Sequence, residues 1–319
     1  MKWLVTGASG FVGRALVARL AADASNEVCA AVRSPGGPLP GLVRRLVVAE
    51  LGPETDWTAA LQGVEVVVHL AARVHVMREK ALDPLAEFRR VNVQATLQLA
   101  RQAAQAGVRR FVFVSSVKVN GESTLPGAAF GPDDPPRPVE AYSQSKLEAE
   151  AALRGLARSV PMEVVVIRPP LVYGPGVQAN FRALMQAVAS ACPLPLGAIH
   201  NRRSFLALDN LVDLLVVCAG HPAAANQVFM ASDGCDLSTT ELMRRLGRVM
   251  QRPVHLWPVP AAVLHWAAWS VGRRAMIERL CGNLQVDISK TRALLDWTPP
   301  VSVDEGLRRA ANAYLRGPG

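Results

Sequence analysis

The segment from Thr6 to Gly13 constrains the fold more than any other part of the chain. It reads Thr-Gly-Ala-Ser-Gly-Phe-Val-Gly and joins an apolar run, Trp3–Thr6, to a helical pattern, Gly10–Ala22. In such a loop one glycine permits the tight turn, one lets the backbone approach a phosphate, and one lets the helix pack closely on the strand. The N–H groups at the start of the helix attract phosphate oxygens. The sequence therefore predicts a strand–loop–helix unit that binds a dinucleotide.

Short apolar runs continue to alternate with helical patterns as far as Arg168. Several runs are apolar on both faces, which is typical of a parallel sheet covered by helices on both sides. Strands are predicted at Trp3–Thr6, Glu27–Val32, Arg45–Val48, Val64–Leu70, Arg110–Ser115 and Glu163–Arg168, and helices at Gly10–Ala22, Pro84–Ala106 and Tyr142–Arg158. This alternation predicts an α/β fold, a Rossmann-type doubly wound parallel sheet, in a cofactor domain of residues 1–168.

Prolines cluster after Arg168, and the remaining patterns are mostly helical. Helices are predicted at Asn180–Ala191, Leu208–Ala219, Thr239–Met250, Ala261–Arg279 and Asp304–Leu315, with short strands at Gln227–Ala231 and Pro253–Leu256. We expect residues 169–319 to form a smaller substrate-binding lobe, some segments of which pack back on the first domain.

Composition narrows the class of partner. The net charge is +9, from 35 Lys+Arg against 26 Asp+Glu, yet the arginines are scattered, so we expect no nucleic acid and favour a small phosphorylated ligand. The five cysteines include no CxxC pair, which indicates a reduced compartment and no metal site. The apolar run at the N-terminus is short for a signal peptide, so a cytoplasmic protein is expected.

The long uncharged stretch from Pro253 to Gly272 is interrupted by prolines and histidines. We expect a packed helix and loop and no integral membrane segment. A core role for Trp257, Trp266 and Trp269 is favoured over a peripheral membrane contact flanked by Arg273 and Arg274.

Two further motifs carry chemistry. Tyr142 and Lys146 stand four residues apart, so on a helix they share a face. A neighbouring ammonium lowers the pKa of a tyrosine and prepares the phenol to move a proton beside a carbonyl or an alcohol. Ser115 and Ser116 end a predicted strand, where ligand groups gather in such sheets. Taken singly, each motif is also compatible with surface or turn residues.

Together the three motifs resemble the extended short-chain dehydrogenase/reductase family, in its nucleotide-sugar branch of epimerases, dehydratases and reductases. The resemblance covers essentially the whole chain. It implies a Ser/Tyr/Lys triad, Ser116, Tyr142 and Lys146, in which Ser116 is preferred to Ser115 because the family spacing to Gly121 fits it. Lys146 would also hold the nicotinamide ribose.

The resemblance implies two further sets of residues. Cofactor contacts are expected at Gly7, Ser9, Gly10, Phe11, Val12, Gly13, Arg33, Glu50, Leu51, Leu70, Ala71, Ala72, Arg73, Asn92, Tyr142, Lys146, Pro169, Leu171 and Val172. Substrate contacts are expected at Lys118, Asn180, Phe181, Arg203 and Arg279, although spacing does not decide which arginine between Arg273 and Arg279 joins Arg203 at the diphosphate.

Two departures from the family pattern guide the choice of activity. Val32 replaces the acid that binds the ribose of NAD, and Arg33 follows it, so NADP(H) is favoured over NAD(H). Lys118 stands where the 4,6-dehydratases carry a glutamate, which argues against dehydratase chemistry.

The resemblance is strongest to UDP-N-acetyl-6-deoxyhexosamine 4-ketoreductases of polysaccharide biosynthesis and to UDP-glucose 4-epimerases. The main expectation is reduction of a UDP-4-keto-hexose at C4, with UDP preferred to dTDP. The alternatives are a UDP-hexose 4-epimerase, a catalytically inactive cofactor-binding regulator, and a membrane-peripheral interaction protein. A homodimer through Pro84–Ala106 and Tyr142–Arg158 is expected from related proteins.

Overall fold

The computed structural model describes residues 1–34, 36–37, 39–40, 43–74, 83–270, 272 and 274–317. Its centre is a seven-stranded sheet in the order β3-β2-β1-β4-β5-β6-β9, and every neighbouring pair is parallel. The strands are β1 Lys2–Thr6, β2 Glu27–Val32, β3 Arg44–Val47, β4 Val66–His69, β5 Arg110–Val114, β6 Glu163–Arg168 and β9 Val228–Met230. The predicted doubly wound parallel sheet is confirmed.

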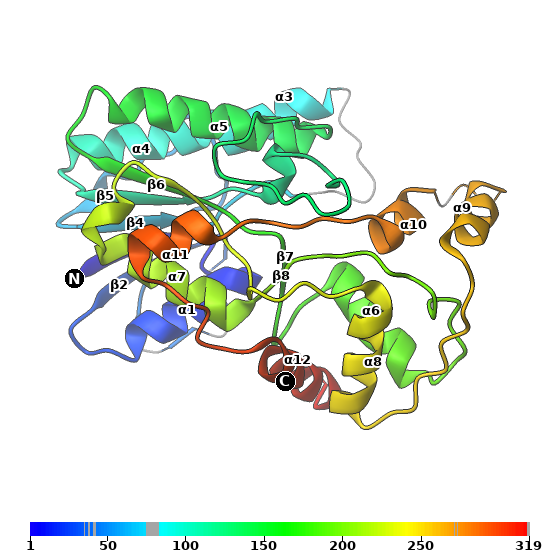
Figure 1. Ribbon diagram of the computed structural model, residues 1–319. Helices are drawn as coiled ribbons and strands as arrows, with labels where there is room; N and C mark the ends of the chain where they lie inside the picture. Colours follow the sequence, from blue (N-terminus) through cyan, green and yellow to red (C-terminus); the bar gives the residue numbers. More distant parts are fainter. Residues whose placement is uncertain are drawn as a thin grey trace.

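Helices cover both faces of the sheet (Figure 1). One face carries α1 Phe11–Ala21, α7 Leu208–Gly220 and α11 Ser289–Leu295, and the other carries α2 Thr58–Leu61, α3 Pro84–Arg89, α4 Ala95–Gln105 and α5 Ala141–Ala157. Successive strand residues enter different cores: Leu4 packs with Leu99 and Leu153 under α4 and α5, whereas Val5 packs with Leu16 and Leu211 under α1 and α7. Burial on both faces explains why the strands are apolar throughout.

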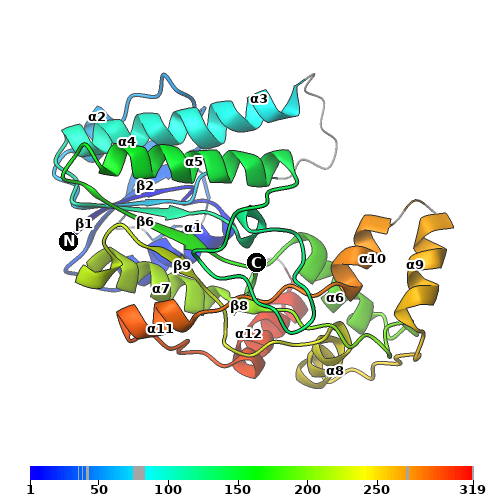
Figure 2. The same ribbon diagram turned by 45° about the horizontal axis from the view of Figure 1, so that its top comes forward.

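The second lobe has a core of its own beside the sheet (Figure 2). It is built from α6 Ala179–Ala189, α8 Thr239–Met250, α9 Ala261–Ser270, α10 Arg274–Cys281, α12 Val303–Leu315 and the parallel pair β7 Leu171–Tyr173 and β8 Phe205–Ala207. Tyr173 stacks on Phe181 with ring centres 5.1 Å apart inside this core. The chain leaves the lobe to place α7, β9 and α11 against the cofactor sheet.

Two predicted elements differ in the structure. Pro253–Leu256 is not a strand, and only Leu256 forms an isolated bridge, to Leu194. Pro253 has no N–H to give a ladder, which limits pairing here. The helix predicted over Ala261–Arg279 is divided into α9 and α10, and Gly272 between them has a φ of +68°. Arg273 lies outside the described residues.

The core role expected for three tryptophans is wrong. Trp257, Trp266 and Trp269 are 61%, 72% and 71% exposed. They are exposed because α9 lies at the end of the lobe farthest from the sheet (Figures 1 and 2). The sequence of α9 has no polar face, so nothing in it indicated which side would face the solvent. In the described residues, no helix is both long enough and apolar enough to cross a membrane.

Candidate active site

The glycine loop after β1 makes a tight turn beside the end of β4. Gly7 has a φ of +65°, and a Cβ there would lie 2.8 Å from the backbone nitrogen of Ala71. A Cβ on Gly13 would lie 2.1 Å from the carbonyl oxygen of Gly7. Gly10 caps α1 without a side-chain hydrogen bond, and the first turn of α1 carries no acidic residue. The N-terminus of α1 is therefore open to an anion.

A cavity of about 870 Å³ opens at this loop. Among the residues predicted to bind the cofactor, its lining includes Gly7, Ser9, Gly10, Phe11, Val12, Gly13, Arg33, Glu50, Leu51, Leu70, Ala71, Ala72 and Arg73. The cavity lies along the carboxyl ends of β1, β2 and β4, where doubly wound sheets bind dinucleotides. Its size, its glycine walls and the open helix end fit an extended phosphate-bearing cofactor.

Asn92 is not in the cavity wall but fixes its edge. It lies in a π-helical turn, Arg90–Gln94, which the structure inserts between α3 and α4. Its side-chain oxygen accepts the N–H of Arg73 at 2.8 Å, and its amide nitrogen donates to the Arg73 carbonyl at 3.0 Å and to Ser145 Oγ at 3.0 Å. Asn92 thus joins the loop after β4 to the helix that carries Tyr142.

A buried histidine holds the other end of that loop. His69 ends β4, and its Nδ1 and Nε2 lie 2.7 Å and 2.9 Å from the hydroxyls of Thr6 and Thr96. Thr6 Oγ1 also accepts the N–H groups of Leu70 and Ala71. Complete burial, with a smaller contribution from the charge of Lys146, lowers the pKa of His69 to about 3. The imidazole is therefore neutral at pH 7 and acts as a positioning group.

Tyr142 and Lys146 occupy the first two turns of α5, as their spacing predicts. Burial raises the pKa of Tyr142 to about 12 and lowers that of Lys146 to about 7. Lys146 Nζ donates to the carbonyl oxygen of Val114 at 2.8 Å and lies 4.4 Å from the ring centre of Phe113. The expected lowering of the Tyr142 pKa by Lys146 is not seen: burial alone raises the pKa of Tyr142, and the amino group of Lys146 is directed to the carbonyl at the end of β5.

The two serines at the end of β5 have different partners. Ser115 is buried and donates to Glu150 Oε1 at 2.5 Å. Ser116 is half-buried, and its Oγ accepts the N–H of Lys118 at 3.2 Å at the start of the short 3-10 turn Val117–Val119. The side chain of Ser115 is therefore buried and bonded to Glu150, whereas Ser116 lies partly exposed just beyond the carboxyl end of β5.

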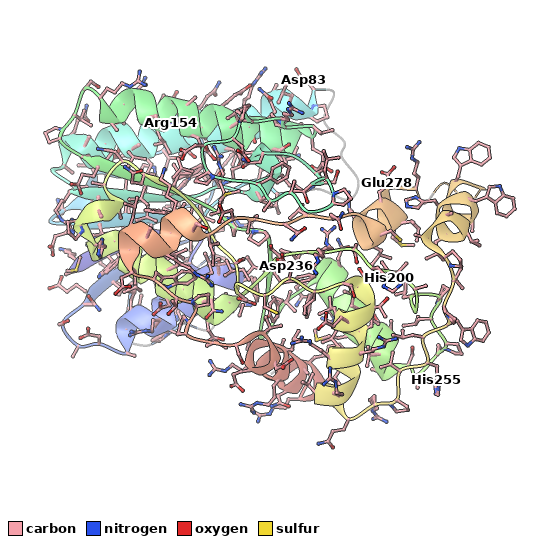
Figure 3. The ribbon with its side chains drawn as sticks, viewed as in Figure 1. Asp83, Arg154, His200, Asp236, His255 and Glu278 are labelled. Carbon is pink, nitrogen blue, oxygen red and sulfur yellow. The ribbon has the colours of Figure 1, made fainter. Side chains whose placement is uncertain are left out.

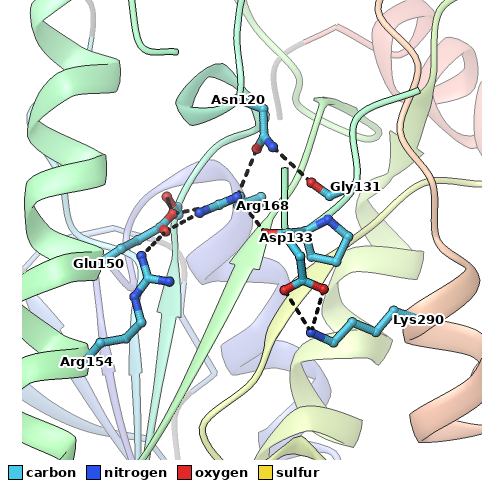
Figure 4. A network of polar contacts seen from close by, with 9 residues as sticks. Asn120, Gly131, Asp133, Glu150, Arg154, Arg168 and Lys290 are labelled. Carbon is cyan, nitrogen blue, oxygen red and sulfur yellow. Dashed lines mark hydrogen bonds and ion pairs between the residues drawn. The ribbon is translucent and has the colours of Figure 1, made fainter. Parts of the chain in front are cut away.

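A buried ion pair fixes the strand ends around these serines (Figure 4). Arg168 at the end of β6 donates to both carboxylate oxygens of Glu150, at 3.0 and 2.6 Å, and to Asn120 Oδ1 at 3.1 Å. The side chains of Glu150 and Arg168 are 0% and 3% exposed. Arg154, which is about half exposed, lies 3.6 Å from the same carboxylate. This pair connects α5, β6 and the loop after the serines.

Three of the predicted substrate residues meet in one charged cluster. Lys118 Nζ lies 2.8 Å from Glu140 and 3.1 Å from Glu122. Glu140, at the start of α5, also lies 3.5 Å from Arg279. Arg203 donates to the Gly282 carbonyl at 3.0 Å; burial lowers its pKa, and the charge of Glu122 partly offsets this. The cluster spans the junction between the sheet and the lobe.

Five further residues predicted to contact the cofactor or the substrate do not line the cavity: Pro169, Leu171, Val172, Asn180 and Phe181. Asn180 is exposed at the start of α6, whereas Phe181 is 1% exposed and its ring belongs to the lobe core. Only the backbone of Phe181 can therefore face a ligand. The carbonyl of Pro169 accepts the N–H of Val117, and Leu171 and Val172 form the strand β7.

The structure also adds residues to the cavity. Trp57, Arg90, Val91 and Val48 line it, as does Val32, which was predicted only as the replacement for an acid. Trp57 is 1% exposed, and in the described part of the chain its indole N–H has no hydrogen-bond partner. No local motif marks Trp57, because the loop between β3 and α2 places it there. Arg90 pairs with Glu50 at 2.8 Å across the cavity rim.

The model of one protein family matches residues 3–231, and its description is NAD dependent epimerase/dehydratase family. The chain is a member of this family. A UDP-glucose 4-epimerase of Vibrio cholerae is 46% identical over 314 residues, which cover 98% of this chain and 95% of that protein.

Solved structures agree with this assignment. MoeE5 in complex with UDP-glucuronic acid and NAD is 26% identical, with a TM-score of 0.78 and complete coverage of both chains. A UDP-glucuronic acid 4-epimerase from Bacillus cereus in complex with NAD has a TM-score of 0.80 at 21% identity, covers 99% of both chains and shares the fold.

The protein is thus an enzyme of the epimerase/dehydratase family, and the predicted relation to the nucleotide-sugar branch is confirmed. These comparisons support the epimerase alternative better than the reductase that the sequence favoured. Both related structures contain NAD, and neither indicates a preference for NADP(H).

Proposed function

We propose that this enzyme is an NAD-dependent UDP-hexose 4-epimerase. The observation that carries the proposal is the 46% identity to a UDP-glucose 4-epimerase along nearly the whole chain. An epimerase removes and returns hydrogen at one carbon, so it needs one acid/base group and a cofactor that stays bound. Tyr142, Lys146 and Ser116 around the carboxyl end of β5 support this assignment.

Each residue of the Ser116, Tyr142 and Lys146 triad has a separate proposed role. Tyr142 takes the proton of the sugar C4 hydroxyl and returns it, and Ser116 hydrogen-bonds the same oxygen. Bound NAD would supply the hydride acceptor for sugar C4. Lys146 holds the nicotinamide ribose, and in its protonated form it favours the phenolate of Tyr142. Because burial raises its pKa to about 12, Tyr142 is protonated at pH 7 where no positive charge acts on it.

Residues of the second lobe are proposed to bind the nucleotide part of the substrate. Arg203 and Arg279 are proposed to bind the diphosphate, for which guanidinium groups are suited by their paired donors. Lys118 and Asn180 are proposed to contact the sugar and the nucleoside. Residues 1–168 are thus proposed to form the cofactor domain, which also contributes Lys118 to the substrate site, and residues 169–319 the substrate lobe, with UDP preferred to dTDP. A homodimer through α3, α4 and α5 completes the proposal.

The test is to incubate the purified enzyme with UDP-galactose and, separately, with UDP-N-acetylgalactosamine, with no added cofactor. We expect conversion to the C4 epimer by proton NMR, and NAD in the acid extract of the protein. Absence of epimerisation, together with NADPH consumption when a UDP-4-keto-hexose is supplied, would replace the epimerase by the reductase. Absence of both activities would favour a cofactor-binding regulator.

A further inference from the structure

The far end of the substrate lobe carries a set of exposed apolar side chains. Val263, Trp266 and Trp269 follow one another at three-residue spacing on one side of α9, and Trp257 stands in the loop before it. They are 50%, 72%, 71% and 61% exposed. Figure 3 shows ring side chains projecting away from the molecule at α9. We call these four residues the indole face. Exposed apolar patches of this kind mark interaction surfaces.

The stretch of sequence that contains the indole face carries basic residues and no acidic ones. No aspartate or glutamate occurs between Glu241 and Glu278, whereas six arginines do: Arg244, Arg245, Arg248, Arg252, Arg273 and Arg274. Arg244, Arg248 and Arg252 are exposed and rim a shallow hollow at the end of α8, directly before the loop that carries Trp257. Basic side chains beside an apolar surface complement anionic headgroups.

The chemistry of the indole face fits a bilayer better than a second copy of the chain. A tryptophan has an apolar body and one N–H donor, which suits the level of the lipid headgroups. A symmetric contact would bring together the exposed Arg244, Arg248 and Arg252 of two copies, which like charges oppose. Ten residues of α9 are too few to span a hydrocarbon core of about 30 Å, so α9 would lie in the plane of the interface.

We propose that the indole face docks the enzyme on an anionic phospholipid bilayer. Trp257, Trp266 and Trp269 enter the headgroup region, and the exposed Arg244, Arg248 and Arg252 contact lipid phosphates. The docking face is connected to the active site, because Arg279 on the adjoining α10 contacts Glu140 at the start of the Tyr142 helix. Docking therefore holds the substrate lobe at the membrane surface. This inference goes beyond the proposed reaction and does not require it.

The experiment is co-sedimentation of the full chain with vesicles of phosphatidylcholine alone and with vesicles that also contain phosphatidylglycerol. We expect at least about tenfold more protein bound to the anionic vesicles, since several arginines near the surface are each attracted to the anionic headgroups. The double variant Trp266→Ser/Trp269→Ser should lose this binding, and Arg248→Glu/Arg252→Glu should lose the preference for anionic lipid.

A matched control is Leu125→Ser/Val139→Ser, which removes two apolar side chains that are 76% and 75% exposed elsewhere on the surface. It should bind as the unaltered protein does. Far-ultraviolet circular dichroism and a thermal melt check that each variant is folded. Equal sedimentation of the tryptophan double variant and the unaltered protein would overturn the proposal. So would failure of the unaltered protein to bind anionic vesicles, or a smaller particle in light scattering for the tryptophan double variant, which would assign the indole face to a second copy.

Discussion

Charged side chains are buried at the carboxyl ends of the strands, whereas apolar side chains are exposed at the far end of the lobe. At the sheet edge, Glu150 and Arg168 are buried as a charged pair that also engages Ser115. At the end of the lobe, the tryptophans of α9 remain in solvent. Burial is therefore decided by which partner the fold supplies, and the polarity of a segment alone does not decide it.

The difference has an energetic side. A buried charge is tolerated only where another charge and further hydrogen bonds compensate for its lost hydration. An exposed indole is tolerated without a partner but loses the free energy that burial would give. Both regions depart from the arrangement that stability alone favours, and both lie where we place a function.

Replacing Tyr142 tests whether the buried edge serves chemistry as well as stability. Tyr142→Phe should lower kcat by about a thousandfold, since a positioned acid/base group contributes roughly 10²–10⁴ in rate. NAD binding should stay close to that of the unaltered enzyme, because the phenyl ring keeps its place beside Phe88, whose ring centre is 6.2 Å away. Turnover by NMR and cofactor binding by calorimetry measure the two effects. Near-normal kcat would remove Tyr142 from the mechanism.

Glu150→Ala tests how much the ion pair contributes to the same edge. Arg168 would be left buried without its carboxylate, which should lower the free energy of unfolding by about 3–5 kcal/mol. Arg154→Ala removes the exposed partner of the same carboxylate and should change it by about 0–1 kcal/mol. Urea unfolding of both variants makes the comparison. Similar losses in the two variants would contradict a special role for burial.

Arg33 is exposed at the cavity rim, so it tests the sequence-based preference for NADP(H). Arg33→Ala should weaken NADPH binding by about 1.5–3 kcal/mol, the range for a hydrogen bond to a charged group. NADH binding should hardly change, because its ribose carries no 2′-phosphate. Dissociation constants for both cofactors in both proteins decide the matter. An equal change for NADH and NADPH would exclude contact with a 2′-phosphate.

The buried His69 predicts a dependence of stability on pH that develops gradually below pH 6.5. Its pKa is about 3 in the fold against 6.5 in an ordinary setting, so below pH 6.5 the unfolded chain binds a proton that the folded chain refuses. The contribution of His69 costs no stability above pH 6.5, and below it the free energy of unfolding falls by about 1.4 kcal/mol for each pH unit, until His69 titrates in the folded chain. Urea midpoints should shift less with pH in His69→Gln. An identical slope in the variant would show that other groups dominate.

Local signals explain which parts of the site the sequence predicted. The glycine loop, Tyr142 and Lys146 are each encoded within a few residues, because a tight turn and an i, i+4 helix face are local geometries. Trp57 has no such signal and reaches the cavity only through the path of the chain. The cluster of Lys118, Glu122, Glu140, Arg203 and Arg279 likewise joins segments far apart in the sequence.

The sequence by itself determined the parallel sheet, since apolar strands alternating with helices have few other ways to bury both faces. It also determined the position of the glycine loop and of the Tyr142 helix. The tertiary structure decided the exposure of the α9 tryptophans, the division of Ala261–Arg279 into two helices, and the pKa values of Tyr142 and Lys146. Those properties depend on what surrounds a group in space, and distant segments supply that environment.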